Sequence, residues 1–190
     1  MEAILIGIPF LTYIYLRVRL GNDISHQERD EALFREGIEL FNAEECVKSF
    51  RYFEAIVKDY PKSATAYFYR AKCHYYFENW EAALIDFEKT LRIDNSIAEA
   101  YLQKANCYYM LEDYKMTLFE LKRASRMYLS KNPDVIRFIG ELEFRGGDFE
   151  SAEKSLKIAS DLGDDQSKAL LQTLFVGNIR NISRYGNERD

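Results

Sequence analysis

Two related stretches decide the fold: residues 67–76 read YFYRAKCHYY, and residues 101–110 read YLQKANCYYM. The second begins 34 positions after the first (101 − 67). Four residues are identical between them, namely Tyr67 and Tyr101, Ala71 and Ala105, Cys73 and Cys107, and Tyr75 and Tyr109. A match at a fixed interval of this size is typical of a protein built from structural repeats.

The same interval runs through most of the chain in three columns. Small residues recur at steps of 34, 34 and 35 at Gly37, Ala71, Ala105 and Gly140. A second small column holds Ser49, Ala83, Thr117 and Ala152, and a large apolar column follows four residues later at Phe53, Phe87, Leu121 and Leu156. One helical hairpin of this length cannot bury its apolar face alone, so the columns predict a stack of hairpins.

Turn-forming residues divide the chain into helices. The capping box at residues 25–28 opens a first helix that we expect to run to about Phe41, with a second starting at Asn42. Later breaks fall at residues 60–63, 78–79, 94–96, 112–113, 132–133 and 146–148. No segment has the alternating pattern of a strand, so the predicted fold class is all-α.

Aligned in this way, the chain resembles the tetratricopeptide repeat (TPR) family. In that family the first helix of each repeat has a large residue, then a Leu-Gly or Leu-Ala pair, and then a later aromatic residue. The residues at these four positions in the four repeats are Leu33, Glu36, Gly37 and Leu40; Tyr67, Arg70, Ala71 and His74; Tyr101, Lys104, Ala105 and Tyr108; and Ile136, Ile139, Gly140 and Glu143. The resemblance covers about residues 30–164. It implies a right-handed superhelical solenoid of antiparallel helix pairs, with about four repeats.

The chain also departs from the family pattern. No Trp occupies the first column, and polar residues replace Leu at Glu36, Arg70 and Lys104. Only Pro61 stands at the family's proline position. After the fourth repeat, Asp164 to about Asn178 predicts an amphipathic capping helix with Leu170, Leu171, Leu174 and Phe175 facing inward. The expected organisation is an N-terminal segment (1–22), a repeat domain (23–178) and a polar tail (179–190).

The N-terminal segment has a composition of its own. Residues 3–16 carry no charge and are followed by Arg17 and Arg19. Its apolar residues are Ile4, Leu5, Ile6, Ile8, Phe10, Leu11, Ile14 and Leu16. A helix of this length is about 21 Å long, short of the ~30 Å hydrocarbon core of a bilayer. It is therefore either a membrane anchor or interfacial segment, or a helix that packs on protein; Glu2 disfavours a cleaved signal peptide. As an anchor it would leave the repeats facing the cytoplasm, because the arginines follow it.

Composition excludes several classes of function. The formal net charge is −5, which disfavours a protein that neutralises many nucleic-acid phosphates. The cysteines, Cys46, Cys73 and Cys107, lack metal-ligand spacing and are expected to be reduced core thiols. No nucleophile, phosphate-loop or zinc-protease motif occurs, and His26 and His74 have structural explanations. We expect no enzymatic activity, no cofactor, no metal and no small-molecule substrate.

A second series of residues runs beside the core columns on the first helices. It consists of Phe41, Tyr75, Tyr109 and Phe144; Phe34, Phe68 and Leu102; and Ile38, Lys72 and Asn106. By the resemblance, this stripe lines the concave groove and would bind a partner's helix or peptide. The alternative is that packing between repeats buries the rings. A subclass that grips chaperone C-termini has Lys and Asn where this chain has Phe34 and Ile38, so that specificity is disfavoured.

Two kinds of function remain open. One is a scaffold or adaptor that recruits a protein partner, at a membrane if the N-terminal segment is an anchor. The other is a constitutive structural subunit of a larger complex whose groove is permanently filled. A third occupant of the groove is the apolar segment Ile4–Leu16 itself, which a partner would then displace.

Overall fold

The structure is a computed structural model that describes residues 26–127 and 132–176, and these residues form helices without any strand. The helices are α2 (His26–Leu33), α3 (Arg35–Asn42), α4 (Cys46–Asp59), α5 (Ala64–Tyr76), α6 (Trp80–Ile93), α7 (Ala98–Met110), α8 (Tyr114–Met127), α9 (Pro133–Arg145), α10 (Phe149–Asp161), α11 (Asp165–Leu171) and the π-helix η1 (Gln172–Val176). The predicted all-α class is confirmed.

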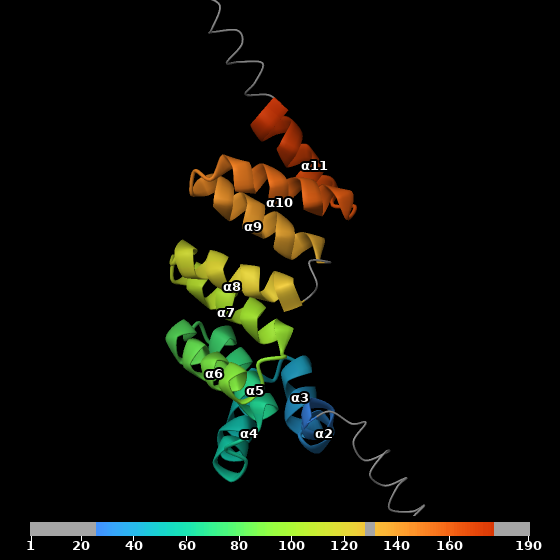
Figure 1. The fold of residues 1–190 in the computed structure, drawn as a ribbon. Helices are drawn as coiled ribbons and strands as arrows, with labels where there is room; N and C mark the ends of the chain where they lie inside the picture. The colour runs from blue at the N-terminus through green and yellow to red at the C-terminus, as the bar shows by residue number, and fades with distance from the viewer. Residues whose placement is uncertain (1–25, 128–131, 177–190) are drawn as a thin grey trace, which may run out of the picture.

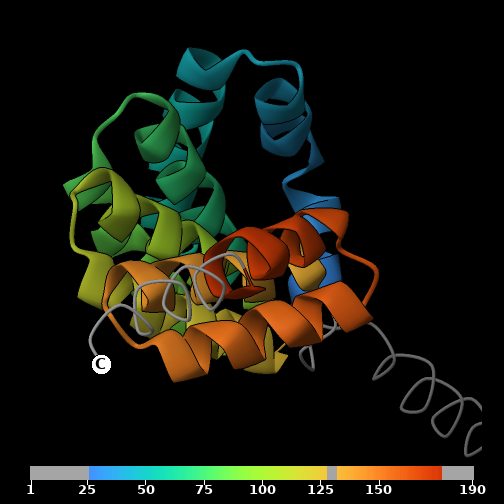
Figure 2. The ribbon, with the colours of Figure 1, turned by 90° about the horizontal axis from the view of Figure 1, so that it is seen from above.

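The helices pack in chain order into a stack. Helix pairs α3/α4, α5/α6, α7/α8 and α9/α10 follow one another from one end to α11 at the other (Figure 1). Seen along the stack, the chain turns counter-clockwise as it approaches the viewer, which is the sense of a right-handed superhelix (Figure 2). The predicted solenoid of four helix pairs with a C-terminal capping helix is therefore confirmed.

The three sequence columns form the core between the helices of each pair. The large column, Phe53, Phe87, Leu121 and Leu156, is completely buried, and Ala71, Ala83, Ala105 and Ala152 are buried with it. The small column allows two backbones to approach closely: Ser49 Oγ donates a hydrogen bond of 2.9 Å to the carbonyl oxygen of Gly37 on the facing helix. Packing of this density makes added volume costly.

Gly140 provides a direct test of this close approach. A Cβ atom at Gly140 would lie 2.9 Å from Cγ of the fully buried Leu156 and 3.3 Å from the carbonyl oxygen of Ala152. We expect Gly140→Ala to lower the free energy of unfolding by about 1–2 kcal/mol, because overpacking outweighs the gain in helix propensity of about 1 kcal/mol. Urea unfolding followed by circular dichroism measures the change. When Gly140→Ala is made in a Leu156→Ala background, it should lower the free energy of unfolding by less than it does in the wild type. An equal decrease in both backgrounds would contradict a steric cause.

The turn inside each helix pair uses a left-handed backbone conformation. In these four turns the residues with positive φ are Glu44 (61°), Glu78 (58°), Glu112 (60°) and Gly147 (84°), one in each repeat. At the second of these turns the amides of Glu78 and Asn79 donate to the carbonyls of Tyr75 and His74, which satisfies the last carbonyls of α5. Only Gly adopts this conformation without strain, so three of the four turns are strained.

The first repeat differs from the prediction at both of its helices. The expected single helix from the capping box to Phe41 is broken at Phe34, whose φ of −103° and ψ of 23° separate α2 from α3. Hydrogen bonds from Phe34 to Asp30 and from Ile38 to Phe34 continue across this bend. The second helix begins at Cys46 and not at Asn42, because the left-handed Glu44 ends α3 first. The predicted end near Phe41 agrees with α3, which ends at Asn42, but the predicted continuity across Phe34 and the predicted start of the second helix were wrong.

Buried ion pairs explain two of the three polar residues in the family's leucine column, Arg70 and Lys104. In the second repeat Arg70 donates two hydrogen bonds to Asp86, at 2.6 and 2.7 Å. In the third repeat Lys104 Nζ lies 2.9 Å from Glu120, whose side chain is 1% exposed. Asp86 and Glu120 are 34 positions apart (120 − 86), so the carboxylate repeats together with the cation. Each pair joins the two helices of its own repeat.

The C-terminal helix caps the stack. Leu170, Leu171, Leu174 and Phe175 are all partly buried, as predicted. Asp164 caps α11 by accepting the amide hydrogen of Ser167 at 2.8 Å, and it binds Arg137 of α9 at 2.6 Å. Burial opposes the charge on Asp164, but these two partners hold its pKa below the usual range. The carboxylate therefore stays charged and ties the cap to the fourth repeat.

The cysteines behave as core residues. Cys46, Cys73 and Cys107 are free thiols, and all are buried. Burial raises the pKa of Cys73 to about 11 and that of Cys107 to about 12. Both thiols are protonated at neutral pH and are poor nucleophiles or metal ligands, as the sequence predicted.

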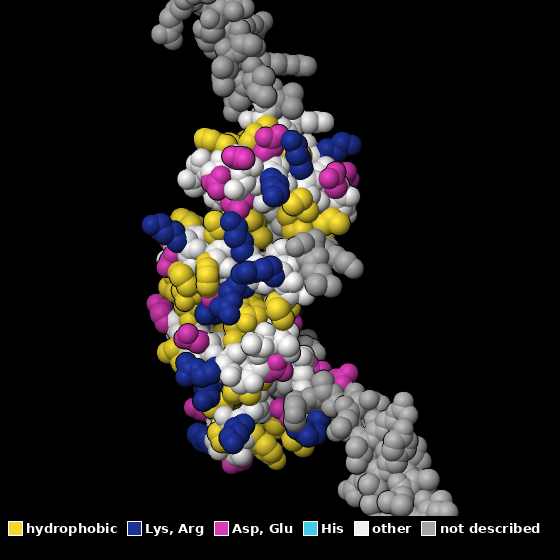
Figure 3. All heavy atoms as spheres, viewed as in Figure 1, with side chains coloured by type: hydrophobic (Ala, Val, Ile, Leu, Met, Phe, Trp, Pro, Cys, Tyr) yellow, Lys and Arg dark blue, Asp and Glu magenta, His cyan; other side chains and the backbone are white. Residues whose placement is uncertain are grey.

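The surface carries both signs of charge. Figure 3 shows acidic, basic and hydrophobic side chains interspersed on the face of Figure 1, with Lys and Arg gathered along its middle, over α8. Within the described residues no helix is both long and apolar enough to cross a bilayer. The apolar segment of residues 3–20 and the polar tail of residues 179–190 both lie outside those residues.

Candidate protein-binding groove

The predicted groove residues lie on the first helix of each pair, except Phe34, which lies at the bend between α2 and α3. Because α3, α5, α7 and α9 repeat every 34 or 35 residues, equivalent positions on these helices form rows along the stack. The row Phe41, Tyr75, Tyr109 and Phe144 is partly buried at all four positions. These side chains keep part of their surface accessible, in contrast to the core columns.

One open hollow of ≈ 420 Å³ brings together three of the predicted residues: Phe41, Lys72 and Tyr75. The other lining residues are Tyr76, Glu78, Trp80, Gln103 and Met110. Tyr76 and Met110 are 58% and 44% exposed. Large rings around a hollow of this size provide much contact area at a small cost in side-chain entropy. We call this site the aromatic hollow.

Sequence reasoning missed five residues that line the aromatic hollow. A signal was present for two of them, since Tyr76 and Met110 each follow a predicted groove residue and are themselves 34 positions apart (110 − 76). Glu78 lies in the turn between α5 and α6, and Trp80 begins α6 directly after that turn, so the left-handed geometry of the turn sets their direction. No helical periodicity predicts the placement of a turn residue.

Lys72 is the cation of the aromatic hollow. Its Nζ lies 4.8 Å from the ring centroid of Phe41, 5.2 Å from that of Tyr69 and 5.3 Å from that of Phe68. The same Nζ contacts Glu99 of α7 at 3.2 Å, and thus joins two repeats. Cation–π contacts with three rings, and a carboxylate from the next repeat, fix the ammonium group at one place in the groove.

Two predicted groove residues lie in the core instead. Phe34 is 1% exposed and meets the ring of Tyr60 edge-to-face at 5.3 Å, and Phe68 is 6% exposed and meets Phe87 at 5.8 Å. Neighbouring repeats cover both rings, so the prediction that they line an accessible groove is corrected. The equivalent Leu102 is only partly buried and lines a separate hollow of ≈ 600 Å³ with Phe138.

The remaining predicted residues have local partners. Ile38 packs on the core of the first repeat, and the side-chain amide of Asn106 donates to Gln103 at 3.5 Å. Tyr109 meets the rings of Phe138 and Tyr114 at 5.3 and 5.8 Å. Phe144 meets Phe149 and Phe175, the latter from η1, at 5.1 and 5.7 Å. Toward the C-terminal cap, the rings of this row are therefore packed against aromatic side chains of later helices.

Burial keeps two titratable rings of α5 in their neutral forms, Tyr75 in the groove and His74 beside the core. It raises the pKa of Tyr75, whose phenol therefore remains a hydrogen-bond donor at neutral pH. It lowers the pKa of His74, which is neutral at pH 7 and packs edge-to-face on Phe50 at 4.9 Å. Within residues 26–127 and 132–176, no group of His, Cys, Asp and Glu side chains is arranged to hold a metal ion.

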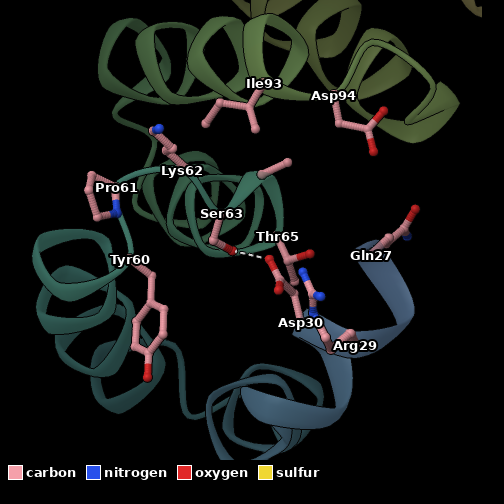
Figure 4. A pocket seen from close by; sticks show the side chains of 11 residues that line it. Gln27, Arg29, Asp30, Tyr60, Pro61, Lys62, Ser63, Thr65, Ile93 and Asp94 are labelled. Carbon is pink, nitrogen blue, oxygen red and sulfur yellow. Dashed lines mark hydrogen bonds between the residues drawn. The ribbon is translucent and has the colours of Figure 1, made fainter. Parts of the chain in front are cut away.

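A larger hollow, ≈ 720 Å³, lies between α2 and the loops that precede α5 and α7. Ser63 and Asp30 point toward each other at its edge, where Ser63 Oγ donates to Asp30 at 2.6 Å (Figure 4). The same Ser63 oxygen accepts the amide hydrogen of Ala66 and caps α5. This contact anchors α2 to the second repeat, and the hollow contains none of the predicted groove residues.

Comparisons with known proteins agree with the fold. No protein-family model and no curated protein matches the chain. Among solved structures, a double mutant of MamA from strain RS-1 superposes with a TM-score of 0.64 at 18% identity, over 72% of this chain and 76% of that one. MamA from Desulfovibrio magneticus RS-1, residue 41 to its end, gives 0.61 at 16% identity over 74% and 77%. YrrB, described as a TPR protein with an unusual peptide-binding site, gives 0.62 at 18% identity over 67% and 65%.

Proposed function

Because the chain is a TPR-like solenoid, we propose that it is a non-enzymatic protein-interaction scaffold that binds a partner's helix or peptide in the aromatic hollow of its concave groove. The observation that carries the proposal is the open hollow between α3, α5 and α7, with Phe41, Tyr75 and the exposed Tyr76 around it. The description of the structurally similar YrrB as peptide-binding supports the same class of partner.

The geometry favours a partner segment with an apolar or aromatic anchor. Four of the eight lining residues are aromatic, and the two charged groups, Lys72 and Glu78, have opposite signs. An aromatic or aliphatic side chain would displace water from the rings, while the segment's backbone or polar groups could pair with the charges at the rim. Lys72 is already held by Glu99, so a second carboxylate would have to compete for it.

We expect Tyr75→Ala to weaken peptide binding at least about tenfold, because a ring in a central pocket is typical of a binding hot spot. The probes are peptides selected from a random library on the full-length protein, measured by fluorescence anisotropy. Phe119→Ala is the matched control: it also removes a ring, but Phe119 is 51% exposed on α8, away from the hollow. Equal binding by wild type and Tyr75→Ala would contradict the proposal.

A constitutive subunit is the second candidate, and the exposed apolar surface at this site favours it. Tyr76, Phe77 and Met110 are 58%, 39% and 44% exposed near the ends of neighbouring helices. A permanently filled groove would leave the isolated protein prone to self-association. Analytical ultracentrifugation of the isolated chain distinguishes an adaptor from a constitutive subunit. A monomer favours the adaptor. Concentration-dependent self-association that Tyr76→Ser reduces favours the constitutive subunit.

We also propose that residues 3–20 tether the scaffold to a membrane with the repeats facing the cytoplasm. Their uncharged run followed by Arg17 and Arg19 supports this. The test is membrane fractionation of the full-length protein beside a protein that starts at Asp23, with an alkaline carbonate wash. Release of both proteins by the carbonate wash would exclude a membrane-spanning anchor, and absence of both from the unwashed membrane fraction would exclude the tether. Crosslinking of the segment to Phe41 or Tyr75 would then test whether it occupies the groove instead.

A further inference from the structure

Helix α8 has a charge opposite to that of the chain as a whole. It carries Lys115, Lys122, Arg123 and Arg126 against the single acid Glu120, a net charge of +3 (4 − 1), whereas the whole chain has −5. Glu120 is 1% exposed and bound by Lys104 at 2.9 Å, so it adds little negative charge to the surface. The basic band in the middle of Figure 3 lies over this helix.

A hollow of ≈ 400 Å³ lies beside this basic surface, between α8 and α10 and over α9. Ile136 and Ile139 of α9 line it and are each 5% exposed, while Ile158 of α10 is 39% exposed. Lys122 and Arg126 of α8 line it one helical turn apart. The site thus combines isoleucine side chains with two cations. We call it the basic hollow.

One acid, Glu143, also lines the basic hollow, but it is already neutralised. It is 3% exposed, Lys122 Nζ lies 2.7 Å from its Oε1, and Ser155 Oγ donates to its Oε2 at 2.7 Å. The Nε atom of Arg126 donates a hydrogen bond of 3.2 Å to the carbonyl oxygen of Lys122. Among the described residues its two terminal amino groups have no acceptor, and they remain available for a charge-assisted pair.

We propose that the basic hollow is a second docking site, which binds an acidic amphipathic segment of a partner protein. An aliphatic side chain of the partner inserts beside Ile158, and a neighbouring carboxylate pairs with Arg126. Charge complementarity selects the acidic partner, because the basic helix α8 would repel a cationic one. A hollow fits an inserted side chain, which favours a protein segment over the flat surface of a membrane.

This site is separate from the aromatic hollow. The two hollows share no lining residue: α3, α5, α7 and the α5–α6 turn with Trp80 form the aromatic one, and α8, α9 and α10 form the basic one. One molecule can therefore hold two partners at once. Binding at the basic hollow does not depend on the proposed function of the groove.

The test uses the full-length protein and a fluorescein-labelled helical peptide of leucine and glutamate, with the leucines on one face. The same peptide with lysine at every glutamate is the first control. We expect the glutamate peptide to bind and the lysine peptide not to bind. Arg126→Glu should weaken the glutamate peptide at least about tenfold, since a lost charge-assisted hydrogen bond and a new repulsion both oppose it.

Two matched variants localise the effect. Lys115→Glu makes the same change of charge on the same helix, roughly 16 Å from Arg126 at about 1.5 Å per residue, and should leave most of the binding intact. Ile158→Ala should weaken binding, whereas Ile85→Ala, at an isoleucine 68% exposed on α6, should not. Circular dichroism checks that each variant keeps the wild-type helix content, as expected for exposed positions.

Three results would overturn the inference. The first is equal weakening by Arg126→Glu and Lys115→Glu, which would indicate attraction by overall charge alone. The second is loss of binding in Tyr75→Ala, which would place the peptide in the aromatic hollow. The third is Arg126-dependent binding to vesicles of phosphatidylserine and phosphatidylcholine without binding to the peptide, which would identify a membrane surface.

Discussion

Replacing Lys104 with methionine is expected to lower the free energy of unfolding by about 3 kcal/mol, because removal of one partner of a buried ion pair strands the other charge. Glu120 is 1% exposed, and after the change Arg123, at 3.5 Å, is its remaining ion-pair partner among the described residues. Total stability of a domain of this size is on the order of 5–15 kcal/mol, so the loss should be visible as a large shift in the urea midpoint.

The double variant Lys104→Met with Glu120→Leu shows whether the pair itself stabilises the fold. Apolar replacements of similar volume remove both the attraction and the desolvation cost, so we expect the double variant to lie within about 1 kcal/mol of wild type. Lys157→Met is the surface control: Lys157 binds Glu153 at 2.6 Å, but the two side chains are 62% and 41% exposed. It should change stability by less than about 0.5 kcal/mol. A single variant no worse than this control would contradict the argument.

Phe87→Ala is expected to have an even larger effect, a loss of about 3–5 kcal/mol. The ring is completely buried between α5, α6 and α7, where it meets Phe68 at 5.8 Å, and its removal leaves a cavity in the middle of the stack. Because a solenoid is stabilised by contacts between neighbouring repeats, damage here should uncouple the repeats on either side. The measurement is chemical unfolding with probes in the first and last repeats.

Phe119→Ala is the control for the same chemical change at the surface. Phe119 is 51% exposed and contacts Arg123 at 5.6 Å from the ring centroid, so its truncation should cost less than about 1 kcal/mol. Two results together would contradict the assignment of Phe87 and its column to the core. They are that the first and last repeats of Phe87→Ala unfold at the same denaturant concentration, and that Phe87→Ala loses no more free energy of unfolding than Phe119→Ala.

The sequence predicted the helix pairs because their signals are local. Asn79, Asp148 and Asp164 each cap the helix that follows, through side-chain hydrogen bonds to backbone amides. The bend at Phe34 has no such signal, since no Pro is nearby and Gly37, the nearest glycine, lies inside the helix that follows the bend. It coincides with the burial of the Phe34 ring against Tyr60, a tertiary contact 26 residues away (60 − 34).

The polar leucine-column residues show the limit of matching a pattern column by column. Arg70 and Lys104 each depart from the family pattern. Each forms an ion pair with a carboxylate on the facing helix, Asp86 for Arg70 and Glu120 for Lys104. In both repeats the cation and its carboxylate are 16 positions apart (86 − 70 and 120 − 104), so comparing the two columns together indicates the ion pair. Comparing each column separately with the family pattern does not indicate it.

The groove was predicted in part, for a geometric reason. Helical periodicity gives the face of a helix on which Phe34, Phe41 and Phe68 lie, but exposure depends on how far each repeat rotates relative to the next. That rotation covers Phe34 and Phe68 and leaves Phe41 beside the aromatic hollow. The basic hollow depends on the packing of three helices, and no single segment of sequence indicates it.

The order of packing along the stack has a consequence for synthesis of the chain. The main contacts join helices that are next to one another in sequence, such as α5 with α6 and α9 with α10. Closing such short loops costs little chain entropy, so each hairpin can form once its own residues have left the ribosome. The first hairpins can therefore fold while the last is still being translated, and each completed hairpin gives the next one an apolar surface on which to assemble.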